Sequence, residues 1–412
     1  MIDHETNGVS LSDTYTIRGG LQCDDMGLGK TIQVVGTIVN NPRESTLIIC
    51  PLATIEQWHR VIQTVCDQFN VLRTHKNGKT VSWRETGASS CPLKRSIYLT
   101  HYEVVQRNQY LVKGRWWDRI VVDEAHRLCG RGVLFRLLQT IRSTIRWAIT
   151  GTPIVNRSRD IYTLLMFLGI REPKKACPQE FIIRRNMDEL RGAGAGFVPF
   201  KPIISCIKLR PSRQELDLLE NVRTREYTPK IVGFMRMRQA SAHPKLVSPE
   251  FPTENTRVRA VCDEVCGSGG NDRKFLVFCQ FTKEIQILLD ALRLRGLCRG
   301  SIEVYDGSLA PDMRTDTIAR AKKDACKVLL MQIQAGGVGL NLQEFDTCIF
   351  TSPWWTSALM DQAVARCVRI GQTKTVRVVF LINEEDCAID NYVLEAANTK
   401  KQLLGELFEE KI

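Results

Sequence analysis

Several features that would assign this chain to a membrane or secreted class are missing from its sequence. No apolar run approaches the roughly 20 residues that span a bilayer, and Met1–Glu5 lacks the basic-then-apolar order of a signal peptide. The 15 cysteines include no C-x-x-C pair, and the closest two, Cys262 and Cys266, have no cluster of histidine or cysteine nearby. These absences predict an intracellular protein with reduced thiols, no membrane segment and no structural zinc site.

Aromatic residues are also sparse, at 7%, whereas charge is abundant and biased toward basic residues. The 412 residues include 57 Lys and Arg against 45 Asp and Glu, which gives a net charge of +12. With 43% hydrophobic residues, the chain is too long for one core and predicts two globular domains or slightly more. The basic excess favours a polyanionic partner such as nucleic acid, although many soluble basic proteins share it.

The stretch Leu21–Ile32 has most of the pattern of a phosphate-binding loop. It contains Gly-Lys-Thr at 29–31, directly before the helical apolar spacing of Ile32–Val39. In such loops the backbone N–H groups cradle phosphate oxygens, the lysine reaches the β- and γ-phosphates, and the threonine holds Mg²⁺. The strict pattern has glycine where Asp24 stands, so the loop alone also fits a glycine-rich connection between a strand and a helix.

Apolar runs after this loop predict a parallel sheet. Leu47–Cys50, Ile97–Thr100 and Arg119–Val122 each have the composition of a buried strand, and helix-like sequence alternates with them. A similar run, Trp147–Ile149, follows. This order predicts an α/β domain with helices on both faces and ligands at the carboxyl ends of the strands.

The third run leads directly into Asp123-Glu124-Ala125-His126. At a strand end, Asp123 can hold Mg²⁺ through water, and Glu124 can orient or deprotonate the water that attacks a γ-phosphate. Acidic residues are also favoured at an ordinary helix start, but their position after a Gly-Lys-Thr loop favours the nucleotide interpretation. The turn Thr150-Gly151-Thr152 after the fourth run could couple the nucleotide to the rest of the molecule.

The second half of the chain repeats the α/β pattern after the glycine-rich stretch 267–270. Phe275–Phe278 and Val328–Met331 have the composition of buried strands, and Ile285–Leu289 that of an amphipathic helix. Arg366 and Arg369 are three residues apart on a helix expected from Ser357, which would place both on one face. Arginines from a second domain can stabilise charge in phosphoryl transfer, although surface arginines paired with carboxylates would have the same spacing.

Taken together, the motifs resemble the SNF2 (Swi2/Snf2) family of DNA-dependent ATPases in helicase superfamily 2. The matching segments cover most of the chain: DDMGLGKT at 24–31, LIICPLATIEQW at 47–58, DEAH at 123–126, ITGTPIVN at 149–156, FIIRR at 181–185, MRQASAHP at 237–244, AGGVGLNL at 335–342 and QAVARCVRIGQ at 362–372. The loop variant and the short protrusions resemble the repair-associated RING-bearing subgroup or the compact global transactivators of baculoviruses, and the absence of accessory modules favours the viral proteins.

The resemblance implies a fold of two RecA-like lobes, each a parallel sheet flanked by helices, with a helical insertion between them. The expected boundaries are 1–170 for the ATP-binding lobe, 171–256 for the helical protrusion or linker region, and 257–412 for the C-terminal lobe. The family's glutamine-containing segment, which precedes the loop and recognises adenine, is not visible. We therefore expect that this segment is lost or that the chain is truncated.

The resemblance also implies roles for individual residues. The expected ATP-binding residues are Asp24, Asp25, Met26, Gly27, Leu28, Gly29, Lys30 and Thr31, with Thr31 and Asp123 holding Mg²⁺. Lys30, Asp123, Glu124, Arg366 and Arg369 are the expected catalytic residues, and Ala125 and His126 complete the DEAH box. The expected coupling residues are Thr150, Gly151, Thr152, Gly337, Gly339 and Gln362. Trp355, at the position of the family's Trp-Asn-Pro tryptophan, is the expected DNA contact, an exposed aromatic at a groove.

The resemblance implies an ATP-hydrolysing translocase or remodeller of double-stranded DNA. It would act in the nucleus, or in the host nucleus if viral, on chromatin, transcription or repair, and a cleft between its lobes would close on Mg-ATP. A non-catalytic regulator that keeps the fold to bind DNA or a partner is the alternative. An RNA helicase is a third possibility, which only the resemblance disfavours.

Overall fold

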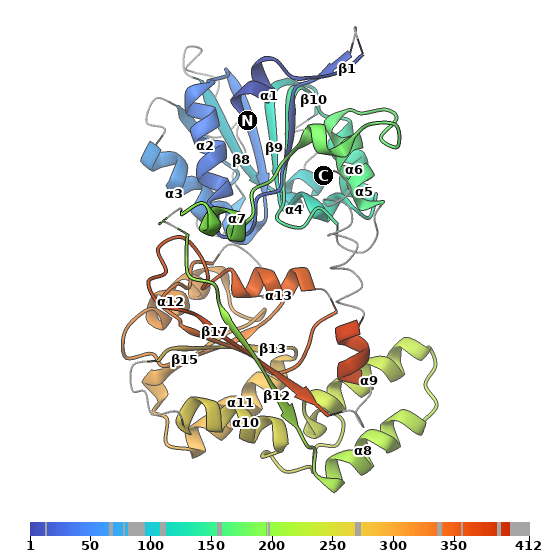
Figure 1. Ribbon diagram of the computed structural model, residues 1–412, viewed down its shortest axis with the longest axis vertical. Helices are drawn as coiled ribbons and strands as arrows, with labels where there is room; N and C mark the ends of the chain where they lie inside the picture. Colours follow the sequence, from blue (N-terminus) through green and yellow to red (C-terminus); the bar gives the residue numbers. More distant parts are fainter. Residues whose placement is uncertain are drawn as a thin grey trace. The chain divides into compact units, whose positions relative to one another are not determined.

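The computed structural model describes residues 1–12, 15–65, 69–76, 79–80, 95–107, 113–154, 159–194, 196, 198–267, 273–335, 340–355, 357–384 and 389–395. The chain forms two compact units, the first built from Met1–Val198 and the second from Pro199–Thr399. Figure 1 shows a sheet with flanking helices in each unit. Within the described ranges, no helix is both long enough and apolar enough to cross a membrane.

The first unit contains a seven-stranded parallel sheet in the order β11-β3-β10-β9-β4-β8-β5 (Figure 1). Its strands are β3 (Gly19–Gln22), β4 (Ser45–Cys50), β5 (Asn70–Arg73), β8 (Ser96–His101), β9 (Trp116–Asp123), β10 (Arg142–Ile149) and β11 (Ile182–Ile183). Its helices are α1 (Ile2–Thr6), α2 (Lys30–Asn40), α3 (Ile55–Val65), α4 (Tyr102–Arg107), α5 (Val133–Gln139), α6 (Asp160–Leu168) and α7 (Met187–Gly192). Two small antiparallel pairs join β1 (Val9–Ser12) to β2 (Tyr15–Ile17) and β6 (His75–Lys76) to β7 (Lys79–Thr80).

Both faces of this sheet are buried, which explains why its strands are continuous apolar runs. On β4, Leu47 and Ile49 pack in the cluster that includes α4, α5 and α6, whereas Ile48 and Cys50 pack in the cluster that includes α2 and α3. Side chains of a strand alternate between faces, so a sheet covered twice needs apolar residues at every position. The predicted parallel sheet with helices on both faces is confirmed.

The second unit has a six-stranded parallel sheet in the order β12-β17-β16-β13-β15-β14. Its strands are β12 (Ile203–Leu209), β13 (Phe275–Cys279), β14 (Ile302–Tyr305), β15 (Val328–Gln332), β16 (Thr347–Phe350) and β17 (Arg377–Asn383). Its helices are α8 (Arg213–Thr224), α9 (Lys230–Ala242), α10 (Thr256–Gly267), α11 (Thr282–Leu294), α12 (Pro311–Ala321) and α13 (Ser357–Val364). Helices α10 and α11 pack with one face of the sheet, and α12 and α13 with the other.

The region 171–256 is only partly helical. Strand β11 pairs with β3 in the first sheet, and β12 pairs along its whole length with β17 at the edge of the second. Helices α8 and α9 then pack against each other, in the part of the region where a helical protrusion is expected. The region therefore supplies an edge strand to each sheet. The side chains of these edge strands are less buried than those of the central strands, so their sequences lack the continuous apolar run by which a central strand is predicted. The boundaries at 170 and 256 stay a prediction.

Candidate functional site

The phosphate-binding pattern forms the connection between β3 and α2. Gly27 and Gly29 have φ values of 89° and 74°, a left-handed region that glycine enters without strain, and α2 begins directly after Gly29. The first backbone N–H groups of an α-helix have no partner within the helix, so they can bind an anion. The loop therefore has the backbone that phosphate binding needs.

Lys30 is the first residue of α2, and its side chain folds back onto this loop. Its Nζ donates hydrogen bonds to the backbone oxygens of Asp24, at 2.8 Å, and Asp25, at 3.1 Å. Burial lowers the pKa of Lys30, and nearby Glu124 and Asp123 oppose that change. A Cβ added to Gly151 would lie 2.8 Å from Cγ of Met26 and 3.3 Å from Lys30 Nζ. The turn predicted for coupling thus packs directly against the loop, and this contact requires glycine.

Asp123 lies at the carboxyl end of β9, and the two donors that its carboxylate has among the described residues are neutral. Trp58 Nε1 donates to Oδ2 at 2.8 Å, and the backbone N–H of Glu124 donates to Oδ1 at 2.9 Å. The Tyr102 hydroxyl donates to the backbone oxygen of Asp123. Burial, followed by repulsion from Glu124, raises the pKa of Asp123 to about 6, although Trp58 and Lys30 act in the opposite direction. This carboxylate is short of positive charge.

The DEAH residues turn sharply after β9. Glu124 has a φ of 51°, a left-handed conformation that is uncommon and strained for a residue other than glycine. Nδ1 of His126 lies 3.1 Å from Oγ1 of Thr150 and 3.3 Å from Oε2 of Glu124. Burial lowers the pKa of His126 to about 4, so its ring is neutral at pH 7. Thr150 also accepts a hydrogen bond from the Thr152 backbone N–H. The two predicted motifs are therefore in direct contact through His126 and Thr150.

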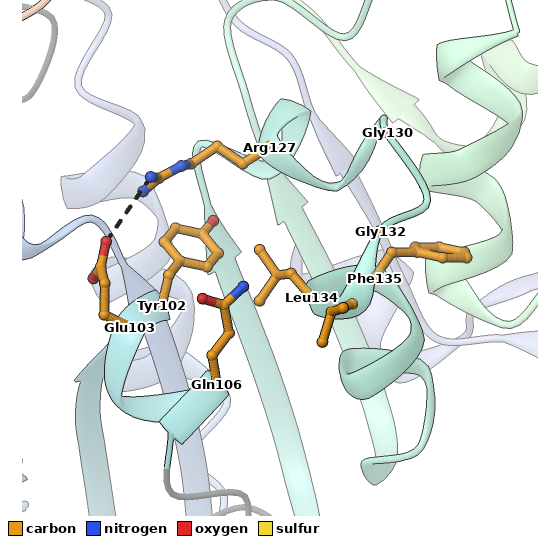
Figure 2. A pocket seen from close by; sticks show the side chains of 9 residues that line it. Tyr102, Glu103, Gln106, Arg127, Gly130, Gly132, Leu134 and Phe135 are labelled. Atoms are coloured by element: carbon orange, nitrogen blue, oxygen red, sulfur yellow. Dashed lines mark ion pairs between the residues drawn. The ribbon is translucent and has the colours of Figure 1, made fainter.

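A hollow of about 330 Å³ borders this turn (Figure 2). In Figure 2 the Arg127 side chain reaches across the hollow toward Glu103, and these two groups form an ion pair at 4.0 Å. The Arg127 guanidinium lies 4.7 Å from the centre of the Tyr102 ring. The lining residues are Tyr102, Glu103, Gln106, Arg127, Gly130, Gly132, Val133, Leu134 and Phe135. Sequence reasoning did not identify this hollow.

The oxygen donors here are of the type that Mg²⁺ prefers. Mg²⁺ is usually held by one or two carboxylates or hydroxyls together with substrate phosphates and water. Asp123 offers a carboxylate without a cationic hydrogen-bond donor, and Thr31 offers a hydroxyl in the first turn of α2. In the described part of the chain, no group of three or more His, Cys, Asp or Glu side chains is placed to hold a metal by itself. The residues present fit a magnesium–nucleotide complex.

The predicted helix that would carry both arginines of the second unit is wrong. Helix α13 ends at Val364, so Arg366 and Arg369 lie in the turns that follow it. The backbone oxygen of Arg366 accepts from the Leu342 N–H at 3.0 Å, and Arg369 donates to the Leu340 oxygen at 3.4 Å. Cys367, between the two arginines, is fully buried with its Sγ 3.5 Å from that of Cys348. The chain therefore turns after α13 and places Cys367 in the core, and no helix continues through Arg366 and Arg369.

Trp355 is less exposed than expected, and its role as a DNA contact stays a prediction. Its ring is half-buried, 4.6 Å from the Phe234 ring, and the Arg238 guanidinium lies 4.6 Å from its centre. Trp354 is 8% exposed, which agrees with the core position expected for it. Gln362 is buried as well. The predicted coupling residues Gly337 and Gly339 lie outside the described residues.

Sequence reasoning missed three residues that hold the first unit's site together: Trp58, Tyr102 and Arg185. Trp58 belongs to a motif that the sequence analysis quotes, and it stands on the apolar face of α3. A tryptophan there would normally be assigned to the core, and only the fold reveals that its N–H meets Asp123. Arg185 belongs to another quoted motif, and its partner, Asp24, is expected from the sequence to bind ATP rather than an arginine.

Residues 3–221 match the SNF2-related domain, and residues 256–371 match the helicase conserved C-terminal domain. The chain is 26% identical to the "Probable global transactivator" of Orgyia pseudotsugata multicapsid polyhedrosis virus, over 99% of this chain and 91% of that protein. It is 26% identical to human "Chromodomain-helicase-DNA-binding protein 1" over 98% of this chain, but only 26% of that protein. It is 27% identical to "ATP-dependent DNA helicase DDM1" of Arabidopsis thaliana, over 93% of this chain and 58% of that protein.

Among solved structures, the chain is similar to "Sulfolobus solfataricus SWI2/SNF2 ATPase core in complex with dsDNA", at 21% identity over 94% of this chain and 92% of that chain. The TM-score is 0.39. The SNF2-related match alone covers more than half of the residues. The chain therefore belongs to the SNF2-related family of helicase-like ATPases, with its two parallel sheets as the two RecA-like lobes of that family.

Proposed function

We propose that this protein hydrolyses ATP to translocate along double-stranded DNA. The observation that carries the proposal is the gathering of the phosphate-binding loop, Lys30, Asp123 and the Thr150 turn at the carboxyl edge of the first sheet. These residues are far apart in the sequence, and each has the chemistry that phosphoryl transfer requires.

In this proposal the phosphates lie on the N–H groups that begin α2. Lys30 exchanges its two loop carbonyls for phosphate oxygens, whose negative charge offsets the burial that lowers its pKa. Thr31 and Asp123 hold Mg²⁺, which neutralises charge on the phosphates when bound. Glu124 orients the attacking water and accepts its proton. Arg366 and Arg369 are the arginines proposed to stabilise the transferred phosphoryl group.

Charge and relatives support DNA as the partner. The net charge of +12 suits contacts to phosphates, which would make binding salt-sensitive and tolerant of sequence. The names of two relatives, the human chromodomain protein and DDM1, include DNA helicase or DNA binding. We therefore propose action on chromatin or the transcription machinery in the nucleus, or in the host nucleus if the chain is viral.

The test is ATP turnover by the purified protein with and without duplex DNA. We expect DNA to raise turnover at least about tenfold, and Lys30→Ala or Glu124→Gln to lower it at least about a hundredfold. Duplex RNA serves as the second nucleic acid, since stimulation by RNA alone would indicate an RNA helicase.

A non-catalytic regulator would give a different result. In that case the wild-type protein would show no turnover under any condition, while it and Lys30→Ala bound duplex DNA equally well in a gel-shift assay. The burial of Arg366, which is 8% exposed, favours this alternative, because a catalytic arginine must be accessible to the phosphoryl group. Turnover that requires Lys30 would exclude it.

A further inference from the structure

The segment that follows β11 runs beside the phosphate-binding loop, although it lies about 160 residues later in the chain. Backbone hydrogen bonds join Cys23 N to Ile183 O at 2.8 Å and Asp25 N to Arg185 O at 3.0 Å. They continue the pairing of β3 with β11 past the ends of both strands. The loop and this segment, Ile183–Met187, therefore share one backbone ladder.

Both aspartates of the loop bind this segment. The Asp24 carboxylate accepts from the Arg185 backbone N–H at 2.8 Å and from its guanidinium, with Nε at 3.0 Å and Nη2 at 2.5 Å from Oδ2. The Asp25 carboxylate accepts from the Met187 N–H, which begins α7, at 2.9 Å. Acidic residues here thus fix the segment at two successive points.

Gln33 connects this cluster to the phosphate-binding helix. Its Nε2 donates to Asp24 Oδ2 at 3.0 Å and to the Leu28 backbone oxygen at 2.8 Å, while its Oε1 accepts from Arg185 Nη2 at 2.5 Å. Gln33 stands in the first turn of α2, and Leu28 in the loop itself. A movement of Arg185 would therefore disturb the loop at Asp24, which it contacts directly, and at Leu28, which it reaches through Gln33.

Electrostatics explains why Arg185 is needed. Asp24 is 0% exposed and lies within a loop that is suited to anions, where an uncompensated carboxylate would repel phosphate. Paired with a bidentate guanidinium, the same carboxylate adds no net charge and gives the loop a rigid anchor. The pair is asymmetric, because the Asp24 side chain is buried and that of Arg185 is 50% exposed.

We propose that Arg185 is a positioning residue for the phosphate-binding loop, and that the loop in turn holds the chain where it leaves the first unit. Segment Ile183–Met187 leads through α7 to Val198, the end of that unit. A nucleotide on the loop would then restrain the exit segment, and loss of the nucleotide would loosen it. This inference rests on the proposed function, because it takes ATP as the ligand of the loop.

The first test measures binding of a fluorescent ATP analogue, with urea unfolding of each variant in parallel. We expect Arg185→Gln to weaken binding about tenfold, because Asp24 is left unpaired next to the phosphates. The double variant Asp24→Asn/Arg185→Gln should regain most of that affinity, because it leaves no buried charge. Arg191→Gln is the matched control: it removes an ion pair with Asp188 on α7, 2.6 Å long, and a 3.7 Å contact with Met187 Sδ, but leaves Asp24 paired, and it should bind as the wild type does.

The second test follows amide hydrogen exchange in peptides that cover Ile183–Met187. Binding of the analogue should slow this exchange at least about threefold in the wild-type protein and in Arg191→Gln, but not in Arg185→Gln. Equal affinities of the three proteins, or exchange that the bound analogue leaves unchanged, would overturn the inference while the proposed function stood. A wild-type protein that does not bind the analogue would overturn both.

Discussion

Two carboxylates of the first unit, Glu5 and Asp123, differ in what surrounds them. Glu5 is 0% exposed and accepts from the Arg119 guanidinium, with Nε at 2.7 Å, as well as from Trp147 Nε1 at 2.8 Å and Asn41 Nδ2 at 2.7 Å. Asp123 accepts from one indole N–H and one backbone N–H, and burial raises its pKa to about 6. One carboxylate is fully compensated, and the other is not.

This difference separates a structural role from a binding role. A buried ion pair with all its hydrogen bonds made has no capacity left for a ligand, and removal of one partner leaves an unpaired charge. A carboxylate held only by neutral donors keeps its geometry but still gains energy from a cation. Glu5 therefore ties α1 to the sheet through Arg119, while Asp123 is poised to receive a positive charge.

The largest effect should come from Glu5→Ala. The variant leaves Arg119 buried at 0% exposure without its carboxylate, and we expect the free energy of unfolding to fall by about 3–5 kcal/mol. Urea unfolding monitored by circular dichroism measures this. A loss below about 1 kcal/mol would contradict the assignment of Glu5 as a structural anchor.

Asp123→Asn should separate activity from stability. We expect ATP turnover to fall about a hundredfold, because the cation loses its carboxylate. The folded protein holds the Asp123 proton up to a pKa of about 6, and the unfolded chain releases it near 3.8, so the wild type loses stability as pH rises through that window. The asparagine variant lacks this loss and should be more stable than the wild type at pH 8, by about 1–3 kcal/mol.

Urea unfolding at pH 4 and pH 8 measures the pH dependence. The advantage of the Asp123→Asn variant should shrink toward pH 4, where the wild-type carboxyl is protonated in the folded state. An asparagine variant that was less stable than the wild type at pH 8 would show that Asp123 is compensated, as Glu5 is.

Two tryptophans allow a matched test, because each donates one indole N–H to one of the two carboxylates. Trp58→Phe should lower ATP turnover about tenfold, since Asp123 loses the donor that orients it. Trp147→Phe should lower the free energy of unfolding by about 1–3 kcal/mol and leave the turnover of the folded protein unchanged. Steady-state kinetics and urea unfolding of both variants decide this, and identical profiles would remove the distinction.

The smallest effect is expected for Asn41→Ala. It removes one neutral donor from Glu5, whose carboxylate keeps its arginine and its tryptophan. We expect unfolding to become easier by about 1 kcal/mol, with no change in affinity for a fluorescent ATP analogue. A larger loss would mean that Arg119 alone does not compensate Glu5.

Local patterns predicted much of this molecule. Continuous apolar runs indicated both parallel sheets, because strands buried on two faces cannot alternate with polar residues. The Gly-Lys-Thr loop and the acidic strand end were identified from spacing, since their geometry depends on a few consecutive residues. The prediction of one helix carrying Arg366 and Arg369 was wrong. Residue spacing does not show that Cys367, which lies between them, is buried in the core.

The sequence by itself thus determined the family and the parallel sheet of each unit, and its prediction of Lys30 and Asp123 as site residues stays a prediction. Only the tertiary structure decided which carboxylates are compensated: it brought Arg185 to Asp24, Arg119 to Glu5 and the Trp58 N–H to Asp123. The physical reason is the sequence separation over which each kind of interaction acts. Backbone preferences and side-chain periodicity act over a few residues, whereas the desolvation and pairing of a charge depend on neighbours that the fold selects from anywhere in the chain.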